Sequence, residues 1–206
     1  MLNNNIIFDF DGVIADTSKK KSEVFRFFFS EFTNGPNIID YHTKHKGISR
    51  YEILNKLYEL ENIKSEREKK RVLTRLNLKM RNLIEKIKIK KKIKEKIKVL
   101  SKSSNLFIAS NAPHNELKLV VNNNKLKNYF ISIYGSKKNF SKKDSIKLIL
   151  KKYKIKKATY IGDTLSDYKI AKSMGLDFIG IKSIFLKKIS NISIYESIVN
   201  INESEF

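Results

Sequence analysis

Short apolar, β-prone runs recur along the chain and are separated by segments with helical periodicity. Five such runs are present, at residues 6–8, 106–109, 130–134, 158–161 and 178–181. Runs that are apolar throughout are typical of strands buried on both faces, as in a parallel sheet with helices on either side. The pattern therefore predicts βαβ units and an α/β fold, a doubly wound, Rossmann-like parallel sheet.

Residues 9–105 separate the first two apolar runs and show only helical periodicity, for example at Val72, Leu76 and Met80. A crossover between parallel strands needs only about a dozen residues, so this stretch is predicted to contain an inserted helical cap. The expected organisation is an α/β core domain of residues 1–15 and 91–206 and a helical cap domain of residues 16–90. The final segment, 192–206, is expected to form a terminal helix.

Charge is the most unusual bulk property, with 43 Lys and Arg side chains against 21 Asp and Glu and a formal net charge of +22. Such a balance often indicates a nucleic-acid or anionic-surface partner. Here the excess is nearly all Lys and accompanies many Ile and Asn residues, as AT-rich coding bias produces at solvated positions. Proteins that read nucleic acids favour Arg, whose planar fork binds bases in a bidentate manner. We therefore expect no specific nucleic-acid partner.

Residue types and patterns that the sequence lacks limit which metal ligands, nucleophiles and cellular locations are expected. The chain has no Cys, which excludes disulfides, thiolate metal sites and cysteine nucleophiles, so any metal is held by oxygen or imidazole. No run approaches the ~18 apolar residues of a membrane span. The apolar start leads directly into Asp9 and Asp11, which the hydrophobic region of a signal peptide does not contain. We expect a cytoplasmic protein without a membrane partner.

Two carboxylates follow the first predicted strand, in the sequence Asp9-Phe10-Asp11-Gly12. At positions i and i+2 of an extended chain, Asp9 and Asp11 point to the same side. Gly12 allows the next turn to bring backbone N–H groups close to an anion. Ligands of open α/β sheets bind at the carboxyl ends of the strands. Because paired carboxylates repel each other, this position indicates a bound cation or a carried proton.

A second acidic motif, Gly162-Asp163-Thr164-Leu165-Ser166-Asp167, follows the predicted strand at 158–161. Asp163 at the strand end and Asp167 one helical turn later can converge with Asp9 on an all-oxygen site. Mg²⁺ prefers such carboxylate-rich sites. Taken alone, the Gly-Asp pair is equally compatible with an ordinary helix N-cap.

Two further segments carry groups suited to an anion. Ser110 and Asn111 end a predicted strand just before Pro113, where a helix N-terminus would favour an anion, although a plain N-cap has the same pattern. Lys142 and Lys143 open another predicted helix. A fixed ammonium there could neutralise a transferring phosphoryl group.

In this order and spacing, the four motifs resemble those of the haloacid dehalogenase superfamily, whose aspartyl phosphatases carry Asp-x-Asp-Gly, then Ser or Thr, then Lys, then Gly-Asp-x-x-x-Asp. The resemblance spans residues 6–181 and implies a doubly wound core with a helical cap inserted after the first motif. It implies that Asp9 is the nucleophile that becomes an aspartyl phosphate and that Asp11 is the general acid/base. We expect the anionic neighbourhood to raise the pKa of Asp11.

The same resemblance assigns the ligands of the metal and of the phosphate. It implies a Mg²⁺ cofactor bound by the Asp9 carboxylate, the backbone carbonyl of Asp11 and Asp163, with Asp167 acting directly or through water. The implied phosphate-binding set comprises Gly12, Ser110, Asn111 and the catalytic lysine, which is Lys142 or, in a shifted register, Lys143.

Within the predicted cap, the segment 45–50, His-Lys-Gly-Ile-Ser-Arg, resembles the substrate-specificity loop of capped, β-phosphoglucomutase-like members of that superfamily. The resemblance implies that Arg50 grips the part of the substrate remote from the reacting phosphate, because its planar fork suits a carboxylate or a phosphate. The alternative is a helix N-cap at Ser49 followed by an exposed Arg50.

The implied activity is that of a Mg²⁺-dependent phosphatase acting on a small phosphorylated metabolite, with phosphoglycolate or a sugar phosphate as the leading substrates and a monomer or weak dimer as the assembly. A phosphomutase is the alternative enzyme, although the superfamily's mutases usually carry Glu-Asp where this chain has Gly162-Asp163. A second carboxylate at Asp11 argues against dehalogenation, which needs neither a metal nor a leaving-group acid. The alternative that is not an enzyme is a basic binding protein built on an inactive scaffold of the same fold.

Overall fold

The apolar runs form the centre of a parallel sheet in the computed structural model, which describes residues 4–45, 47–183, 186 and 189–206. Within these residues the sheet has six strands in the order β3-β2-β1-β4-β5-β6, and every neighbouring pair is parallel. The strands are β1 (Asn4–Phe8), β2 (Ser104–Pro113), β3 (Ser132–Ser136), β4 (Thr159–Gly162), β5 (Asp177–Ile181) and β6 (Ser193–Tyr195). The predicted doubly wound, Rossmann-like α/β fold is confirmed.

Both faces of the sheet are buried, as the continuous apolar strands predicted. Along β1, Ile6 and Phe8 pack into one apolar cluster and Ile7 into another, because successive side chains of a strand point to opposite faces. The helices α5 (Lys91–Ser103) and α6 (His114–Asn123) contribute to the first cluster. The helices α7 (Lys142–Lys152) and α8 (Leu165–Ser173) contribute to the second. The strand ends are therefore the part of the sheet open to ligands.

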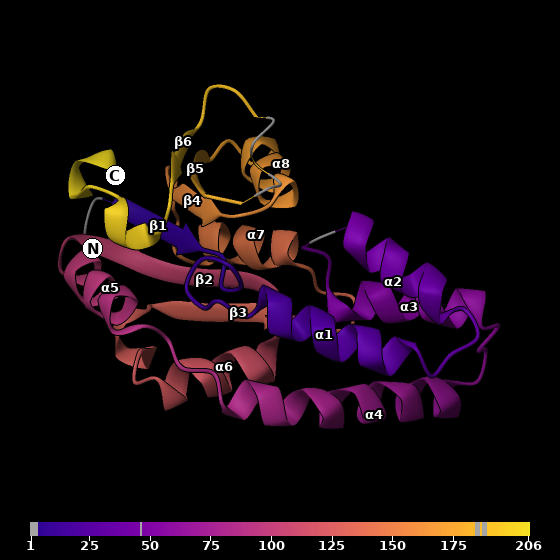
Figure 1. Ribbon diagram of the computed structural model, residues 1–206. Helices are drawn as coiled ribbons and strands as arrows, with labels where there is room; N and C mark the ends of the chain where they lie inside the picture. Colours follow the sequence, from indigo (N-terminus) through magenta and orange to yellow (C-terminus); the bar gives the residue numbers. More distant parts are fainter. Residues whose placement is uncertain (1–3, 46, 184–185, 187–188) are drawn as a thin grey trace.

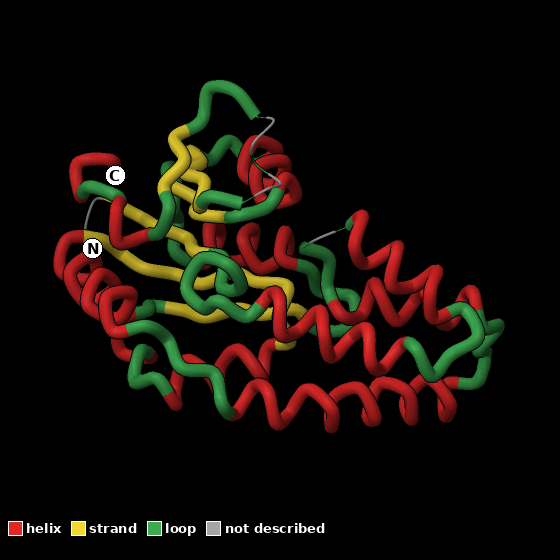
Figure 2. Tube along the Cα trace, viewed as in Figure 1, coloured by secondary structure: helices red, strands yellow, loops and turns green. Residues whose placement is uncertain are grey.

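Four helices between β1 and α5 lie together beyond the carboxyl ends of the strands (Figures 1 and 2). They are α1 (Ser18–Phe29), α2 (Gly35–Lys44), α3 (Arg50–Leu60) and α4 (Glu66–Glu85). Their apolar faces pack on one another, and α4 also packs on α6 of the sheet layer. This is the segment predicted as an inserted cap; the boundaries at residues 15/16 and 90/91 stay a prediction. None of the described helices is long and apolar enough to cross a bilayer.

Two local predictions differ from the structure. The third apolar run becomes a strand only at residue 132, because Lys127–Tyr129 form a 3₁₀ turn, η1, before it. The segment 192–206 is not the predicted terminal α-helix: it contains β6 followed by the 3₁₀ turns η2 (Ile198–Asn200) and η3 (Glu203–Glu205). A three-residue strand has no readable periodicity, and β6 forms because the free edge of β5 supplies its hydrogen-bond partners.

We expect Leu76→Ala on α4 to lower the free energy of unfolding by about 2–5 kcal/mol, because Leu76 is fully buried and its loss leaves a cavity. Leu78→Ala on the same helix is the matched control, since Leu78 is 60% exposed, and should change stability by about 0.5 kcal/mol or less. Urea denaturation followed by circular dichroism measures both. Equal losses in the two variants would contradict the packing described for α4.

Candidate active site

The loop after β1 places two acidic residues at the carboxyl edge of the sheet. The backbone N–H of Asp9 donates to Ile161 of β4 at 2.8 Å, which extends the sheet by one residue and buries the carboxylate at 4% exposure. Gly12 has a φ of +84° and lies so close to Asp163 that a Cβ would collide with its carboxylate. The N–H of Gly12 donates to Ala15 at 2.8 Å. Gly12 therefore shapes the loop, and the structure shows its N–H bonded within that loop.

A buried lysine joins two of the carboxylates. Lys142 Nζ lies 2.9 Å from Oδ2 of Asp9 and 2.7 Å from Oδ1 of Asp167, and the side chain is 2% exposed. Ser141 caps α7 in a capping box with Asp144, so that the helix starts at Lys142 and directs it inward. Lys143, the alternative in a shifted register, is exposed. The ion pairs raise the pKa of Lys142 although its burial would lower it.

Asp9, Asp163 and Asp167 each offer an oxygen within 4.8 Å of the others. Burial, followed by repulsion from neighbouring carboxylates, raises the pKa of Asp163 to about 8. Burial also raises the pKa of Asp9, to about 6, although Lys142 opposes the shift. The cluster therefore resists becoming fully anionic on its own, as expected of carboxylates that share a site.

The donor set fits a divalent cation. Oδ1 of Asp9 and Oδ1 of Asp163 are buried and have no hydrogen-bond partner among the described residues. Such orphaned carboxylate oxygens are the ligands that Mg²⁺ prefers. Asp167 differs, since its Oδ1 accepts from Lys142 and its Oδ2 accepts from Thr164 Oγ1 at 2.6 Å. Its two oxygens thus already position the lysine and the start of α8.

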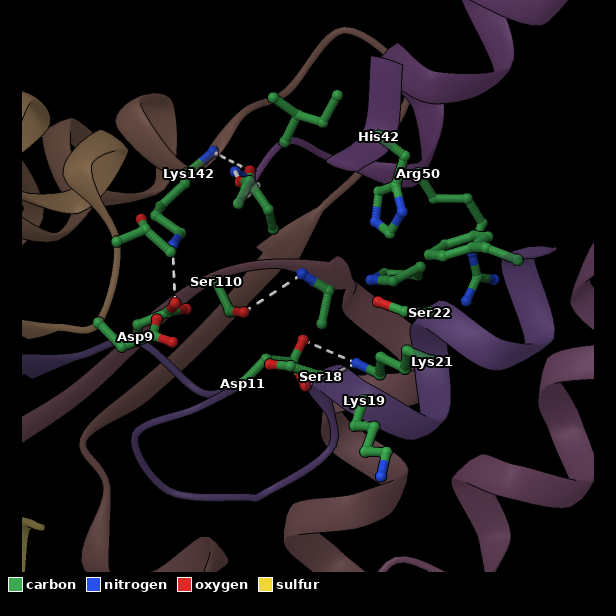
Figure 3. A pocket seen from close by; sticks show the side chains of 18 residues that line it. Asp9, Asp11, Ser18, Lys19, Lys21, Ser22, His42, Arg50, Ser110 and Lys142 are labelled. Atoms are coloured by element: carbon green, nitrogen blue, oxygen red, sulfur yellow. Dashed lines mark hydrogen bonds and ion pairs between the residues drawn. The ribbon is translucent and has the colours of Figure 1, made fainter. Parts of the chain in front are cut away.

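The pKa of Asp11 is lowered, whereas the sequence analysis expected it to be raised. Burial would raise the pKa of its carboxyl, but the ion pair with Lys21 and the hydrogen bond from Thr17 together lower it. Lys21 Nζ, on the first turn of α1, lies 2.7 Å from each carboxylate oxygen of Asp11, and Figure 3 shows the two side chains pointing toward each other. The prediction was wrong because Asp11 faces a lysine of the helical segment rather than only its acidic neighbours.

The strand end of β2 contributes Ser110 and Asn111. Ser110 is 1% exposed and its Oγ accepts from the N–H of Ala112 at 3.2 Å. Asn111 binds the backbone on two sides: its Nδ2 donates to the carbonyl of Gly47, and its Oδ1 accepts from the N–H of Lys142 at 3.1 Å. Ser110 therefore lies at the predicted anion site, whereas the amide of Asn111 ties the sheet to the helical segment.

The predicted specificity loop lies against this edge, although its residue Lys46 is outside the described residues. Gly47 has a φ of +87°, and a Cβ there would lie 3.1 Å from Thr164 Oγ1. Ser49 is the N-cap of α3, in a capping box with Glu52, as the alternative interpretation held. Arg50 is not exposed, however: it is 4% exposed and paired with Glu116 of α6.

These residues line one cavity of about 440 Å³ between the strand ends and the helical segment, a volume suited to a small metabolite. Figure 3 shows Asp9, Asp11, Ser110 and Lys142 on its sheet side and His42 and Arg50 on its helical side. Of the predicted site residues, those that line the cavity are Asp9, Asp11, Arg50, Ser110, Asn111, Lys142 and Asp163. Gly12 and Asp167 do not line it: Gly12 lies in the loop after β1, and Asp167 is paired with Lys142.

Sequence reasoning missed several contributors. His42 lines the cavity and its ring packs edge-on against Phe25 at 4.9 Å, whereas His45, nearest the predicted loop, is exposed. Tyr160 is fully buried, and its hydroxyl donates to Asp167 at 3.2 Å. The apolar run 158–161 indicates that Tyr160 is buried, but no local signal marks its hydroxyl or His42 as part of the site.

Most of the chain matches a known protein family. Residues 6–181 match the family model of haloacid dehalogenase-like hydrolases. No curated protein sequence is similar enough to count as a match.

Solved structures share the fold at low sequence identity. The β-phosphoglucomutase of Clostridium difficile is 20% identical, with 100% of this chain and 95% of that chain covered and a TM-score of 0.77. A predicted phosphatase from Clostridium acetobutylicum is 21% identical, covers 94% of each chain and has a TM-score of 0.73. A predicted phosphoglycolate phosphatase from Haemophilus somnus is 13% identical, covers 95% of each chain and also has a TM-score of 0.73.

In the absence of metal, the stability of the protein should fall as the pH rises toward 8. The folded state raises the pKa of Asp163 to about 8 and that of Asp9 to about 6, above the value of about 4 in an unfolded chain. The folded state thus binds more protons than the unfolded state between these limits, so its stability decreases with pH. Thermal denaturation in chelator from pH 5 to 8.5 measures the slope.

Asp163→Asn should flatten that slope because it removes the carboxyl with the larger shift. Asp177→Asn, at an exposed position of β5, is the matched control and should keep the wild-type slope. A wild-type melting temperature that does not fall with pH, or that falls no more steeply than that of Asp163→Asn, would contradict the raised pKa values.

Proposed function

Because the chain belongs to the haloacid dehalogenase-like hydrolase family, we propose that it is a Mg²⁺-dependent phosphatase that hydrolyses a small phosphorylated metabolite. One observation carries the proposal. Asp9 has one oxygen held by a buried ammonium and the other without a hydrogen-bond partner among the described residues, at the wall of a cavity that Asp11 and Asp163 also line. This is the arrangement that an anionic nucleophile needs in order to approach an anionic phosphate.

Asp9 is proposed as the nucleophile. One carboxylate oxygen forms a bond to phosphorus while the bond from phosphorus to the ester oxygen breaks, which gives an aspartyl phosphate on Asp9 and an alcohol. Lys142 keeps its positive charge next to the reacting group, since its ion pairs raise its pKa, and it offsets the repulsion between carboxylate and phosphate. Asp167 acts through Lys142 by holding its ammonium in place, and the Tyr160 hydroxyl donates to Asp167 in turn.

Asp11 is proposed to give a proton to the departing ester oxygen and then to take one from the water that hydrolyses the aspartyl phosphate. In the ligand-free structure it is paired with Lys21 instead. Incoming phosphate gives Lys21 another anion to bind and places negative charge beside Asp11, and both effects raise the pKa of Asp11. The general acid is therefore formed only when a phosphate is present.

The metal would be held by Asp9 and Asp163, with the backbone carbonyl of Asp11 as a further ligand and Asp167 one shell away. Their orphaned oxygens and raised pKa values support this assignment. When bound, Mg²⁺ supplies charge neutralisation for the phosphate and for the crowded carboxylates. Ser110, buried at the end of β2, is proposed to bind the phosphate by its hydroxyl, which can donate while its oxygen accepts from Ala112.

A phosphatase is favoured over a phosphomutase by the contacts of Gly162. A Cβ at this position would overlap the side chain of Asp167, so the Glu that the superfamily's mutases usually carry here does not fit beside Asp167 as it stands. The leading substrates remain phosphoglycolate and a sugar phosphate. A basic binding protein on an inactive scaffold is supported only by the net charge of +22, and it gives no reason for three clustered carboxylates.

Asp9→Asn should abolish turnover, because an amide does not form the phosphoenzyme. Asp11→Asn should lower kcat by about 100-fold or more, as expected for loss of general acid/base catalysis, while leaving metal affinity within about 3-fold, since Asp11 is proposed to lend the metal its carbonyl only. Phosphate release from an aryl phosphate and titration calorimetry with Mg²⁺ measure the two properties. Near-normal hydrolysis by Asp9→Asn would exclude the covalent route.

Chelation should abolish activity and Mg²⁺ should restore it, whereas Ca²⁺, which prefers more ligands at longer distances, should inhibit. Asp163→Asn should weaken Mg²⁺ binding at least about 10-fold, and Asp177→Asn should leave it unchanged. Full activity in excess chelator would show that the oxygen cluster serves another purpose.

A further inference from the structure

Tyr160 on β4 brings a phenol hydroxyl to the ion pair of Lys142 and Asp167. Its side chain is fully buried, and its ring is stacked beside that of Phe178 on β5, with the planes 22° apart and the ring centroids 6.4 Å apart. An apolar cluster surrounds the ring, and side chains in a close-packed interior do not change rotamer freely. The packing of the ring therefore fixes where the hydroxyl lies.

The hydroxyl has two acceptors within reach and one proton to donate. Its oxygen lies 3.2 Å from Oδ1 of Asp167 and 3.3 Å from the carbonyl oxygen of Ala109 on β2. The bond to the carboxylate is the stronger one, because a hydrogen bond to an ionised group is about twice as strong as one between neutral groups. A bond to Ala109 would only stabilise the sheet, so the two acceptors correspond to two different roles for Tyr160.

Asp167 is held on both of its oxygens. Its Oδ2 accepts from the backbone N–H of Thr164 at 3.1 Å and from the Thr164 hydroxyl at 2.6 Å. Its Oδ1 accepts from Lys142 at 2.7 Å and from Tyr160. A carboxylate has about four acceptor sites, and these four donors occupy them. Among the described residues, Tyr160 is therefore the donor that fixes Oδ1 independently of the lysine.

The position of this oxygen determines where the lysine ammonium lies. Lys142 Nζ has three N–H groups, and it lies 2.9 Å from Oδ2 of Asp9 and 2.7 Å from Oδ1 of Asp167 (Figure 3). If Oδ1 moved, the ammonium would move with it, away from Asp9. A displacement of about 1 Å at a reacting group can lower a rate about 100-fold.

Resting on the phosphatase function above, we propose that Tyr160 is a positioning residue for phosphoryl transfer: its hydroxyl fixes the Asp167 carboxylate, which holds the Lys142 ammonium beside Asp9. Tyr160 does not line the cavity, so it acts on the reacting group only through Asp167 and Lys142. A correctly placed ammonium stabilises the charge of the transition state more than that of the bound substrate. Loss of the hydroxyl should therefore lower kcat and leave KM nearly unchanged.

Tyr160→Phe removes the hydroxyl and keeps the ring. With Mg²⁺ and an aryl phosphate as substrate, its kcat should be about 10-fold or more below that of the wild type, as expected for one lost hydrogen bond to a charged group. Its KM should change by less than about 3-fold. Tyr153→Phe is the matched control and should keep the wild-type kcat, because the Tyr153 ring packs on Phe107 in the same apolar cluster at 5.1 Å.

Asp167→Ala tests the route by which Tyr160 acts. In that background, Tyr160→Phe should lower kcat by less than about 2-fold further, because substitutions within one hydrogen-bond network are not additive. An equal 10-fold loss with and without the Asp167 carboxylate would overturn the proposal. So would a Tyr160→Phe variant that has a lower melting temperature and a wild-type kcat, since that outcome assigns the hydroxyl to Ala109.

The position of the ammonium can also be measured without turnover. Lys142 is 2% exposed and paired with two carboxylates, so its N–H groups should exchange slowly and give a signal in a proton–nitrogen correlation spectrum, assigned through Lys142→Arg. Tyr160→Phe should shift or broaden this signal, whereas Tyr153→Phe should not. If neither the wild type nor any variant hydrolyses a phosphate ester, the phosphatase function fails. An unchanged Lys142 signal in Tyr160→Phe separately overturns the positioning role, and a shifted one supports it.

Discussion

The ammonium of Lys142, buried between Asp9 and Asp167, is the interaction on which the site depends. Two carboxylates and one lysine that are almost fully buried are stable only together, because any one of them alone would be an uncompensated charge in the interior. The lysine comes from the first residue of α7, Asp9 from the end of β1 and Asp167 from α8. The pairing thus joins three strand–helix units at the carboxyl edge of the sheet, and it leaves Oδ1 of Asp9 without a hydrogen-bond partner among the described residues.

The same edge couples the sheet to the helices inserted between β1 and α5. Asn111 holds both the N-terminus of α7 and the carbonyl of Gly47, and Glu116 holds Arg50. Each contact uses a polar group from a strand end or helix start, where backbone and side-chain groups are not already consumed by secondary structure. These contacts join the helical segment to the sheet directly beside the cavity.

Charge is distributed unevenly between the sheet side and the helical side of the cavity. On the sheet side, burial and mutual repulsion raise the pKa values of Asp9 and Asp163, so these groups gain from a cation. On the helical side, Lys21 and Arg50 are neutralised by Asp11 and Glu116 in turn. Under the proposed function, an anionic substrate entering between them would compete with Asp11 and Glu116 for these two cations.

Local sequence patterns determined the class of fold, the position of the inserted helices, and the carboxylates, serine and lysines at the strand ends, because apolar periodicity and short motifs are properties of neighbouring residues. Tertiary structure decided the rest. The packing buried Lys142 rather than Lys143 beside the carboxylates, and it paired Asp11 with Lys21, which lowers the pKa of Asp11. It also buried Arg50 against Glu116 and formed β6 on the edge of β5. Arg50 and Glu116 are 66 positions apart and Asn111 and Gly47 are 64. Contacts over such separations follow from how layers pack and not from any local period. The sequence therefore identified most of the candidate site residues, and the packing decided their partners and the direction of their pKa shifts.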